Sequence, residues 1–129
     1  MEMNGLTAKI IKAAIAVHQE LGPGLLESVY QSCLAIQLRE EEGLKILTEV
    51  PLPVVFRNRK ISDQGYRLDI LVEDAIVLEL KSVEKVQAVH LKQLLTYLRL
   101  ANKPLGLLLN FNESLMKNGI TRVANGINI

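Results

Sequence analysis

The stretch that decides the fold runs from Tyr66 to Ser82 and reads YRLDILVEDAIVLELKS. Two runs of apolar and β-branched residues are separated by the acidic pair Glu73-Asp74. Two such runs around a short polar break predict a β-hairpin. Three charged residues interrupt the apolar runs: Asp69, Glu79 and Lys81. Charges inside apolar strands are costly to bury unless they are paired or bind a metal, so these three are the first candidates for chemistry.

The register of the hairpin decides whether Asp69 and Glu79 meet, because side chains alternate between the two faces of a strand. A two-residue loop would place Asp69 opposite Leu78. A three-residue loop, which ends at Ala75, would place Asp69 opposite Glu79. We predict the three-residue loop or an equivalent bulge. Directly opposed Cβ atoms lie about 4.5–5.5 Å apart, so the two carboxylates could then share a cation.

Two carboxylates and a lysine on one sheet face have a chemical logic. Hard oxygen ligands suit Mg²⁺ or Mn²⁺, and such a metal lowers the pKa of a bound water and stabilises charge on a phosphoryl oxygen. A neighbouring Lys81 could position the attacking water or hold the developing charge. A plainer interpretation is an ion pair between Glu79 and Lys81 on a solvated strand. The motif alone leaves both interpretations open.

The rest of the chain supplies helices and further strands. Helical spacing of apolar residues predicts helices over 5–21, about 25–42 and about 86–101. Two more strands are expected, an edge strand over 46–56 that contains two prolines and a buried one over 105–111. Residues 113–129 are weakly patterned, with a short helix near 113–118 and a last strand. The order predicts an α/β fold, a mixed sheet flanked by helices in one domain over 1–129.

Composition excludes several classes of protein. The 129 residues fit one domain, and a formal charge of +1 excludes a strongly basic, histone-like binder. One cysteine, Cys33, cannot form an internal disulfide, and with His18 and His90 alone beside it a structural zinc site is not expected. We expect a cytoplasmic protein from the lone cysteine and the absence of a signal peptide. No apolar run has the roughly 20 residues of a membrane helix.

Two helices carry polar residues with more than one interpretation. Gln93 and Tyr97 are four residues apart, so they share a helix face with His90, and this face could simply be the exposed side of an amphipathic helix. His90 fits a surface histidine better than a metal ligand. Glu27 falls in the first turn of its helix, where the helix dipole favours a carboxylate, and Tyr30 fits the core.

Together these residues resemble the GxxExxY family, a group of small proteins in the PD-(D/E)XK nuclease superfamily. The family signature corresponds to Gly24, Glu27 and Tyr30. The nuclease motif corresponds to Asp69 followed by Glu79, Leu80 and Lys81, and a Gln-x-x-x-Tyr motif to Gln93 and Tyr97. The resemblance covers the chain from about Ile15 to Arg122, and no element of the catalytic motif is missing.

The resemblance implies a restriction-endonuclease-like αβββαβ core with Mg²⁺ or Mn²⁺ at the carboxylate face. The implied metal ligands are Asp69, Glu79 and the carbonyl of Leu80. The implied catalytic residues are Lys81, which would act on the attacking water, with Glu79, Asp69 and the nearby Glu27. The implied supporting or substrate-binding residues are Gln93 and Tyr97, which would orient Lys81 or contact DNA, and Tyr30.

Three classes of function follow. The first is a metal-dependent nuclease that hydrolyses phosphodiester bonds of DNA, with RNA as the second substrate. The alternative is a non-catalytic nucleic-acid or protein-binding module that uses basic residues such as Arg57, Arg59, Lys60, Lys85 and Lys92. The third is an oligomerising protein, because residues 10–17 are unusually apolar. The expected partners are nucleic acid, with DNA ahead of RNA, and a second copy of the chain or another protein.

Overall fold

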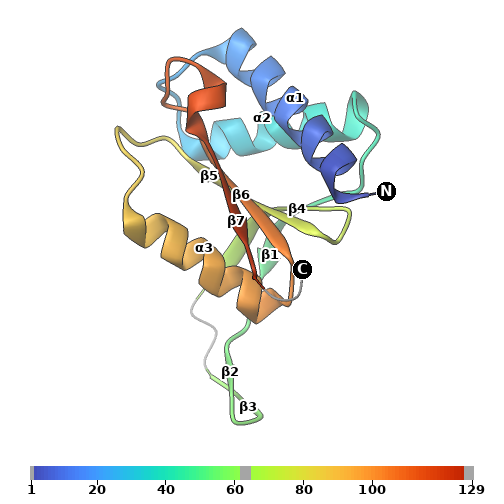
Figure 1. Cartoon of the computed structure of the whole chain (residues 1–129), viewed down its shortest axis with the longest axis vertical. Coiled ribbons are helices and arrows are strands. Elements are labelled where there is room, and N and C mark those ends of the chain that lie inside the picture. Colours follow the sequence, from blue (N-terminus) through green and yellow to red (C-terminus); the bar gives the residue numbers. More distant parts are fainter. Residues whose placement is uncertain (1, 62–64, 127–129) are drawn as a thin grey trace.

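The computed structural model of the chain describes residues 2–61 and 65–126. These residues form three α-helices, a five-stranded sheet and a separate two-stranded ribbon (Figure 1). The helices are α1 (Met3–Leu21), α2 (Glu27–Glu40) and α3 (Ala88–Ala101). The strands of the main sheet are β1 (Ile46–Pro51), β4 (Arg67–Val72), β5 (Ile76–Lys81), β6 (Leu105–Asn110) and β7 (Ile120–Ala124). A short 3-10 helix, η1 (Met116–Gly119), precedes β7.

The sheet is mixed, with strand order β1-β4-β5-β6-β7. β5 and β6 run parallel, and every other neighbouring pair is antiparallel. β1 lies at an edge, as its proline content predicts, and every residue of β6 is buried, as expected for an interior strand. The predicted α/β class, with a mixed sheet flanked by helices, is therefore confirmed.

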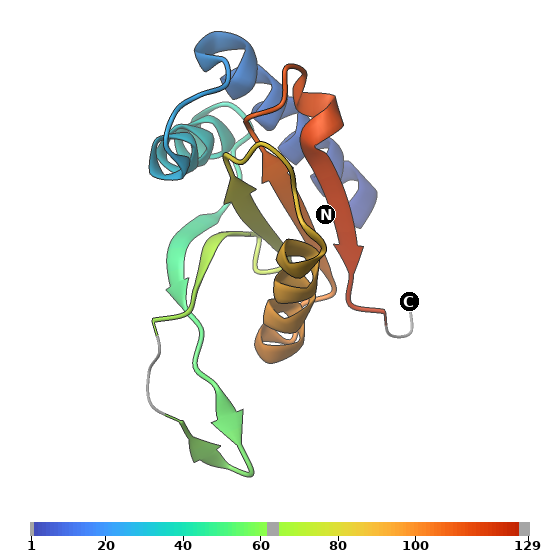
Figure 2. The ribbon, with the colours of Figure 1, turned by 90° about the vertical axis from the view of Figure 1, so that its left-hand side faces the viewer.

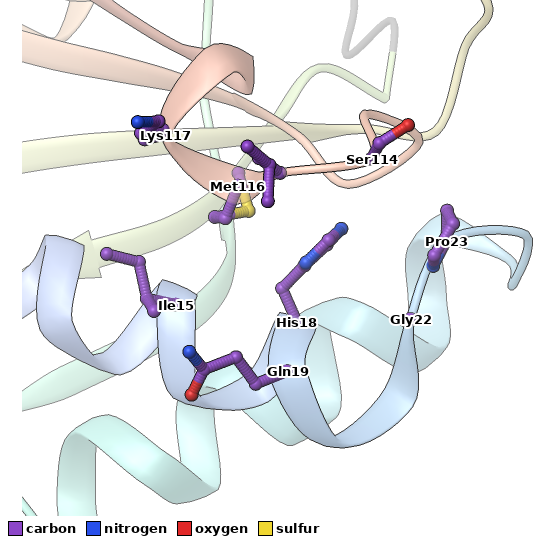
Figure 3. Close-up of a pocket in the computed structure, with 9 residues that line it drawn as sticks. Ile15, His18, Gln19, Gly22, Pro23, Ser114, Met116 and Lys117 are labelled. Carbon is purple, nitrogen blue, oxygen red and sulfur yellow. The ribbon is translucent and has the colours of Figure 1, made fainter.

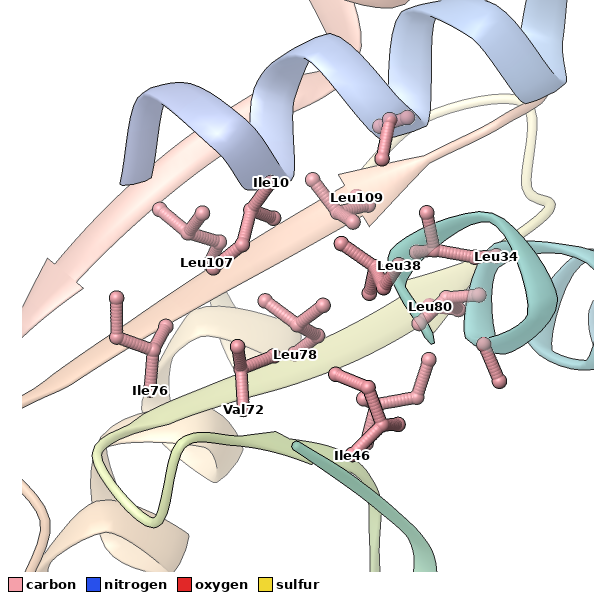
Figure 4. Close-up of a cluster of buried hydrophobic side chains, with 14 of the residues drawn as sticks. Ile10, Leu34, Leu38, Ile46, Val72, Ile76, Leu78, Leu80, Leu107 and Leu109 are labelled. Carbon is pink, nitrogen blue, oxygen red and sulfur yellow. The ribbon is translucent and has the colours of Figure 1, made fainter. Parts of the chain in front are cut away.

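Helices cover both faces of the sheet (Figures 1 and 2). On one face, α1 and α2 pack on Ile76, Leu78 and Leu80 of β5, and Figure 4 shows this cluster. On the other face, Leu94 and Leu98 of α3 belong to a second cluster, together with Val77. Alternate residues of β5 thus face opposite layers, which places Glu79 on the α3 side with Val77.

The hairpin between β4 and β5 has the three-residue loop. Val72 pairs with Ile76 and Ile70 pairs with Leu78. The two residues after Val72, Glu73 and Asp74, have φ values of 50° and 55°, in the left-handed region. The prediction of the three-residue loop is confirmed, and the same register carried one pair further sets Asp69 opposite Glu79.

The segment after β1 differs from the expected continuous strand. β1 ends at Pro51, and the chain forms a separate ribbon from β2 (Val55–Phe56) and β3 (Arg59–Lys60). Prolines lack the N–H that a strand ladder needs, and Pro51 and Pro53 bracket the point where pairing within the main sheet stops. The expected edge strand over 46–56 is thus divided between β1 and β2, and β3 adds a strand that was not expected. The ribbon projects from the body of the molecule (Figures 1 and 2).

In the described part of the chain, none of the helices is long and apolar enough to cross a membrane.

Gly119, at the end of η1, tests how tightly the chain closes over the end of β6. A Cβ at this position would lie 2.2 Å from the carbonyl oxygen of Asn110. We expect Gly119→Ala to lower the free energy of unfolding by about 3 kcal/mol, because backbone must move to accept the methyl group. Denaturant unfolding measures this change. Gly126→Ala is the control, since a Cβ there meets no atom within 4 Å. Equal stability of the two variants would contradict the packing described here.

Candidate active site

The side chains of Asp69 and Glu79 lie together where β4 and β5 part. Their regular pairing extends as far as Ile70 and Leu78. Beyond it, the Leu80 N–H donates to Asp69 Oδ2 at 2.9 Å, and the Asp69 N–H donates to Glu79 Oε1 at 3.3 Å. Each carboxylate therefore bonds to the backbone of the facing strand. This arrangement brings the two acids to one place on the α3 side of the sheet.

The two carboxyl groups are held in surroundings that disfavour their charges. Glu79 is only 7% exposed. Its pKa is raised from 4.5 to about 8, first because the side chain is buried and then because Asp69 lies beside it. Burial also raises the pKa of Asp69, although the hydrogen bond from the Leu80 N–H opposes this shift. A bound cation would relieve both effects.

Lys81, the last residue of β5, is half-buried two positions after Glu79. Its positive charge lowers the pKa of both Asp69 and Glu79, so its ammonium group lies within electrostatic reach of both. Within residues 2–61 and 65–126, however, Lys81 forms no ion pair with Glu79. The plain ion-pair interpretation therefore lacks the contact it requires.

Glu27 connects the start of α2 to the end of β5. It is the first residue of the helix, and its Oε2 accepts a hydrogen bond from the Ser82 N–H at 3.1 Å. The Ser82 hydroxyl in turn donates to the Leu25 carbonyl at 2.9 Å. The Glu27 charge contributes to the raised pKa values of Asp69 and Glu79. Glu27 thus serves the helix start and also lies beside the carboxylate pair.

Tyr30 fixes the loop that carries Glu27. Its ring is fully buried and stacks on Phe111, with ring centroids 4.5 Å apart. Its hydroxyl donates to the Gly22 carbonyl and accepts from the Leu25 N–H at 3.1 Å. Tyr30 therefore lies out of reach of a substrate and holds the loop before α2 from within the core.

Gln93 and Tyr97 of α3 differ in their exposure. Tyr97 is buried in the α3-side cluster, whereas Gln93 is exposed, so the two do not form a uniformly exposed polar stripe. Burial raises the pKa of the Tyr97 phenol, and the nearby charge of Glu79 raises it further. Both residues line a cavity of about 370 Å³, together with Tyr66. No hydrogen bond links either of them to Lys81 in the part of the chain that the structure describes.

His90 has a structural role at the start of α3. Its Nδ1 accepts a hydrogen bond from the Gln87 N–H at 2.9 Å, and this contact completes a capping box at the helix N-terminus. His90 is half-buried, and its ring nitrogen is engaged in the cap.

Asn110 is a positioning residue that sequence reasoning missed. It is fully buried, its Oδ1 accepts from the Val83 N–H at 3.1 Å, and its Nδ2 donates to the Val83 carbonyl at 2.9 Å. The next N–H, of Phe111, donates to the Lys81 carbonyl at 2.9 Å. These bonds hold the chain directly after Lys81. The signal in the sequence was an asparagine that ends an otherwise apolar strand.

Glu49 is a second missed residue. The antiparallel register of β1 and β4 places it opposite Asp69, and its charge raises the Asp69 pKa. Its φ of 52° is in the left-handed region, which is uncommon for a residue other than glycine, asparagine or aspartate. Backbone strain of this kind is typical of functional sites. The sequence held no signal for it, because the register of β1 could not be set from its pattern.

The donor set fits a divalent metal that keeps part of its water shell. Among the residues described, no three His, Cys, Asp or Glu side chains converge as a metal site. The carboxylates that lie together are those of Asp69 and Glu79, and the Leu80 N–H donates to Asp69 beside them. Mg²⁺ is commonly bound in this way, through one or two carboxylates with waters in the remaining positions. The buried, charge-disfavoured Glu79 carboxyl supports the fit, since a cation would compensate its charge.

A larger cavity elsewhere lacks these features. It has a volume of about 530 Å³ and lies between α1 and the η1 region, where His18 and Met116 line it (Figure 3). Its lining residues include no carboxylate. The Nε2 of His18 is already within 2.7 Å of the Glu113 carbonyl oxygen. The choice of candidate site therefore rests on the carboxylate pair and not on cavity size.

Comparison with known proteins agrees with this geometry. A model of the PD-(D/E)XK nuclease superfamily matches residues 4–123, so the chain belongs to that superfamily. Membership implies a nucleic-acid partner, and members typically use divalent metals. Searches of curated proteins and of solved structures found no match.

Tyr30→Phe tests the support of the Glu27 loop. The variant keeps the stacking on Phe111 but loses both hydrogen bonds of the hydroxyl, so we expect the free energy of unfolding to fall by about 1–2 kcal/mol. Chemical denaturation measures this loss. Tyr66→Phe serves as the control and is expected to change stability by less than about 0.5 kcal/mol, since Tyr66 is partly exposed. Equal effects of the two substitutions would refute the assigned role.

Glu79→Gln tests the raised pKa of Glu79 through the pH dependence of protein stability. Between pH 4.5 and about 8 the unfolded chain releases the Glu79 proton while the folded chain keeps it, so the stability of the metal-free protein should fall as pH rises. The total loss is up to about 5 kcal/mol, because each pKa unit corresponds to about 1.36 kcal/mol. The Gln variant lacks this loss and should be the more stable protein at pH 8. Parallel stability curves for the two proteins across this window would show that Glu79 ionises normally.

Proposed function

We propose that this member of the PD-(D/E)XK nuclease superfamily is a metal-dependent nuclease that hydrolyses phosphodiester bonds of DNA, with RNA as a second substrate. The observation that carries the proposal is the meeting of Asp69 and Glu79 from facing strands, with Lys81 within electrostatic reach of both. We also propose that the chain belongs to the narrower GxxExxY group, whose signature corresponds to Gly24, Glu27 and Tyr30. In support, Tyr30 holds the loop before α2, and Glu27 accepts from the Ser82 N–H, one residue after Lys81.

Asp69, Glu79 and the Leu80 carbonyl would hold Mg²⁺ or Mn²⁺. When bound, the metal supplies a more acidic water and neutralises charge on a phosphoryl oxygen. Glu79 must be ionised to act as a ligand, and its pKa of about 8 means that binding near neutral pH releases a proton. Apparent metal affinity should therefore rise with pH up to about 8.

The other residues act on the substrate and on the attacking water. The Lys81 ammonium would donate a hydrogen bond to this water or to the phosphoryl oxygen that gains charge. Glu27 would add negative charge near the metal from the start of α2. Gln93 and Tyr97, which line the cavity beside the carboxylates, would contact the nucleic-acid backbone. Tyr30 supports Glu27 and does not touch the substrate.

The oligomeric state and the cellular location stay predictions. α1 buries Leu6, Ile10 and Val17 in the core, which accounts for most of its apolar character. A homodimer, or a complex with a partner protein, would add contacts for target recognition. A light-scattering mass of two chains would support the homodimer. The single cysteine is compatible with a cytoplasmic location.

Lys81→Ala tests catalysis directly. With Mn²⁺ or Mg²⁺ and plasmid DNA, we expect the cleavage rate to fall by about 10²–10⁴-fold, because the variant loses the group that acts on the attacking water. Asp69→Asn should give a similar loss that added metal restores only in part. Lys117→Ala, an exposed lysine of η1, is the control and should cleave at the wild-type rate. Gel analysis of nicked and linear products measures each rate.

Two outcomes would overturn this function. If Lys81→Ala and the wild type cleave equally, the cleavage comes from another protein or another site. If the wild type binds DNA in a salt-dependent way but cleaves none with either metal, the scaffold is a non-catalytic binding module.

A further inference from the structure

The ribbon formed by β2 and β3 is the part of the described chain that projects furthest from the core (Figures 1 and 2). Val55 pairs with Lys60 and Phe56 with Arg59, and the Ile61 N–H donates to the Val54 carbonyl at 2.9 Å. All residues from 55 to 61 are exposed. The ribbon thus contributes little to the two cores, so packing does not explain which residue types it contains.

The charge of the ribbon is positive throughout. Arg57, Arg59 and Lys60 lie within seven residues, 55–61, that include no acid. None of the three forms an ion pair with any described residue. In a chain with a formal charge of only +1, this tip therefore concentrates three cations that have no ion-pair partner among the described residues.

The ribbon also exposes apolar surface next to its cations. Phe56 is 60% exposed, and the Arg57 guanidinium carbon lies 5.0 Å from the centroid of its ring. Val55 and Ile61 are exposed beside it. Stacking of an arginine on an aromatic ring holds the cation in place and leaves its outer N–H groups free for an anion. Preorganised cations with exposed apolar neighbours are typical of a binding surface.

The base of the ribbon borders a cavity that α3 also lines. The cavity of about 370 Å³ is lined by Val54, which precedes β2, and by Tyr66, which precedes β4. Its other wall is α3, with Gln93 and Tyr97. The Tyr97 phenol lies close enough to Glu79 for that carboxylate to raise its pKa. The cavity at the base of the ribbon therefore shares Tyr97 with the α3-side cluster that also contains Val77 of β5, the strand of Glu79.

We propose that the β2–β3 ribbon is the part of the protein that grips duplex DNA, through phosphate contacts from Arg57, Arg59 and Lys60. The inference rests on the proposed nuclease function and names its substrate class. The major groove of B-form DNA is about 12 Å wide and admits a two-stranded β-ribbon. The major groove of duplex RNA is too narrow for side chains to enter, so the shape favours DNA.

The test is metal-free binding of a short fluorescent DNA duplex, followed by anisotropy over a series of salt concentrations. The ribbon variant is Arg57→Gln, Arg59→Gln and Lys60→Gln combined. Each lost phosphate contact should reduce the slope of log K against log salt by about 0.9, so the variant should lose about 2.7 of the wild-type slope. Phe56→Ala should bind more weakly at an unchanged slope, because it removes contact area and no charge.

The matched control removes the same charge from another surface. Lys9, Lys12 and Lys117 lie on α1 and η1, and changing all three to Gln should leave the slope within about 1 of the wild type. Loss of slope only in the ribbon variant would support the proposal. Equal losses in both variants, no loss in the ribbon variant, or no binding of DNA by the wild type would overturn it. Tighter binding of single-stranded DNA or duplex RNA than of duplex DNA would overturn the choice of substrate.

The binding experiment distinguishes failure of the ribbon proposal from failure of the proposed nuclease function. Because binding is measured without metal, it does not depend on cleavage. If the wild type cleaves DNA but the ribbon variant keeps the wild-type salt slope, the proposed nuclease function stands and the proposed role of the ribbon is wrong. If the wild type never cleaves DNA but the ribbon variant loses the salt slope, the proposed nuclease function is wrong. The ribbon then stands as a DNA-binding element.

Discussion

The register of the β4–β5 hairpin is the constraint on which the rest of the structure depends. The sheet buries Ile76, Leu78 and Leu80 against α1 and α2, so β5 can sit in the sheet in one way only. A slip of one residue would drive Glu79 into that core and turn the leucines toward α3. The three-residue loop fixes the register of β4 against β5, with Ile70 opposite Leu78. The pairing that satisfies the core therefore also brings two carboxylates together on the opposite face.

This arrangement costs stability, and the surrounding contacts offset the cost. A buried carboxyl with a pKa near 8 beside a second acid is unfavourable in the absence of a cation. The two acids do receive backbone N–H donors across the hairpin. Tyr30 and Asn110, each buried in the core, bind the loops before Glu27 and after Lys81. The acids are thus held in place by groups that need no metal.

The sequence predicts those parts of the site whose placement follows from local pattern. Strand alternation and loop length suffice to bring Asp69 to Glu79, and the motif around Glu27 was recognisable. Glu49 could not be found, because its place opposite Asp69 depends on a pairing between strands separated by the whole ribbon. The burial of Tyr97 was missed because helical spacing identifies a face without showing what covers it. The ribbon could not be predicted, because two-residue strands leave almost no periodicity in the sequence.

The most direct test of the account is the position of a metal. A crystal of the wild type soaked in Mn²⁺ above pH 8, where Glu79 is ionised, would locate the ion by anomalous scattering. The account predicts one strong peak between the Asp69 and Glu79 carboxylates, within bonding distance of an oxygen from each. The same soak of Glu79→Gln should show a weaker peak or none. A fully soaked wild-type crystal with no peak there would contradict the account.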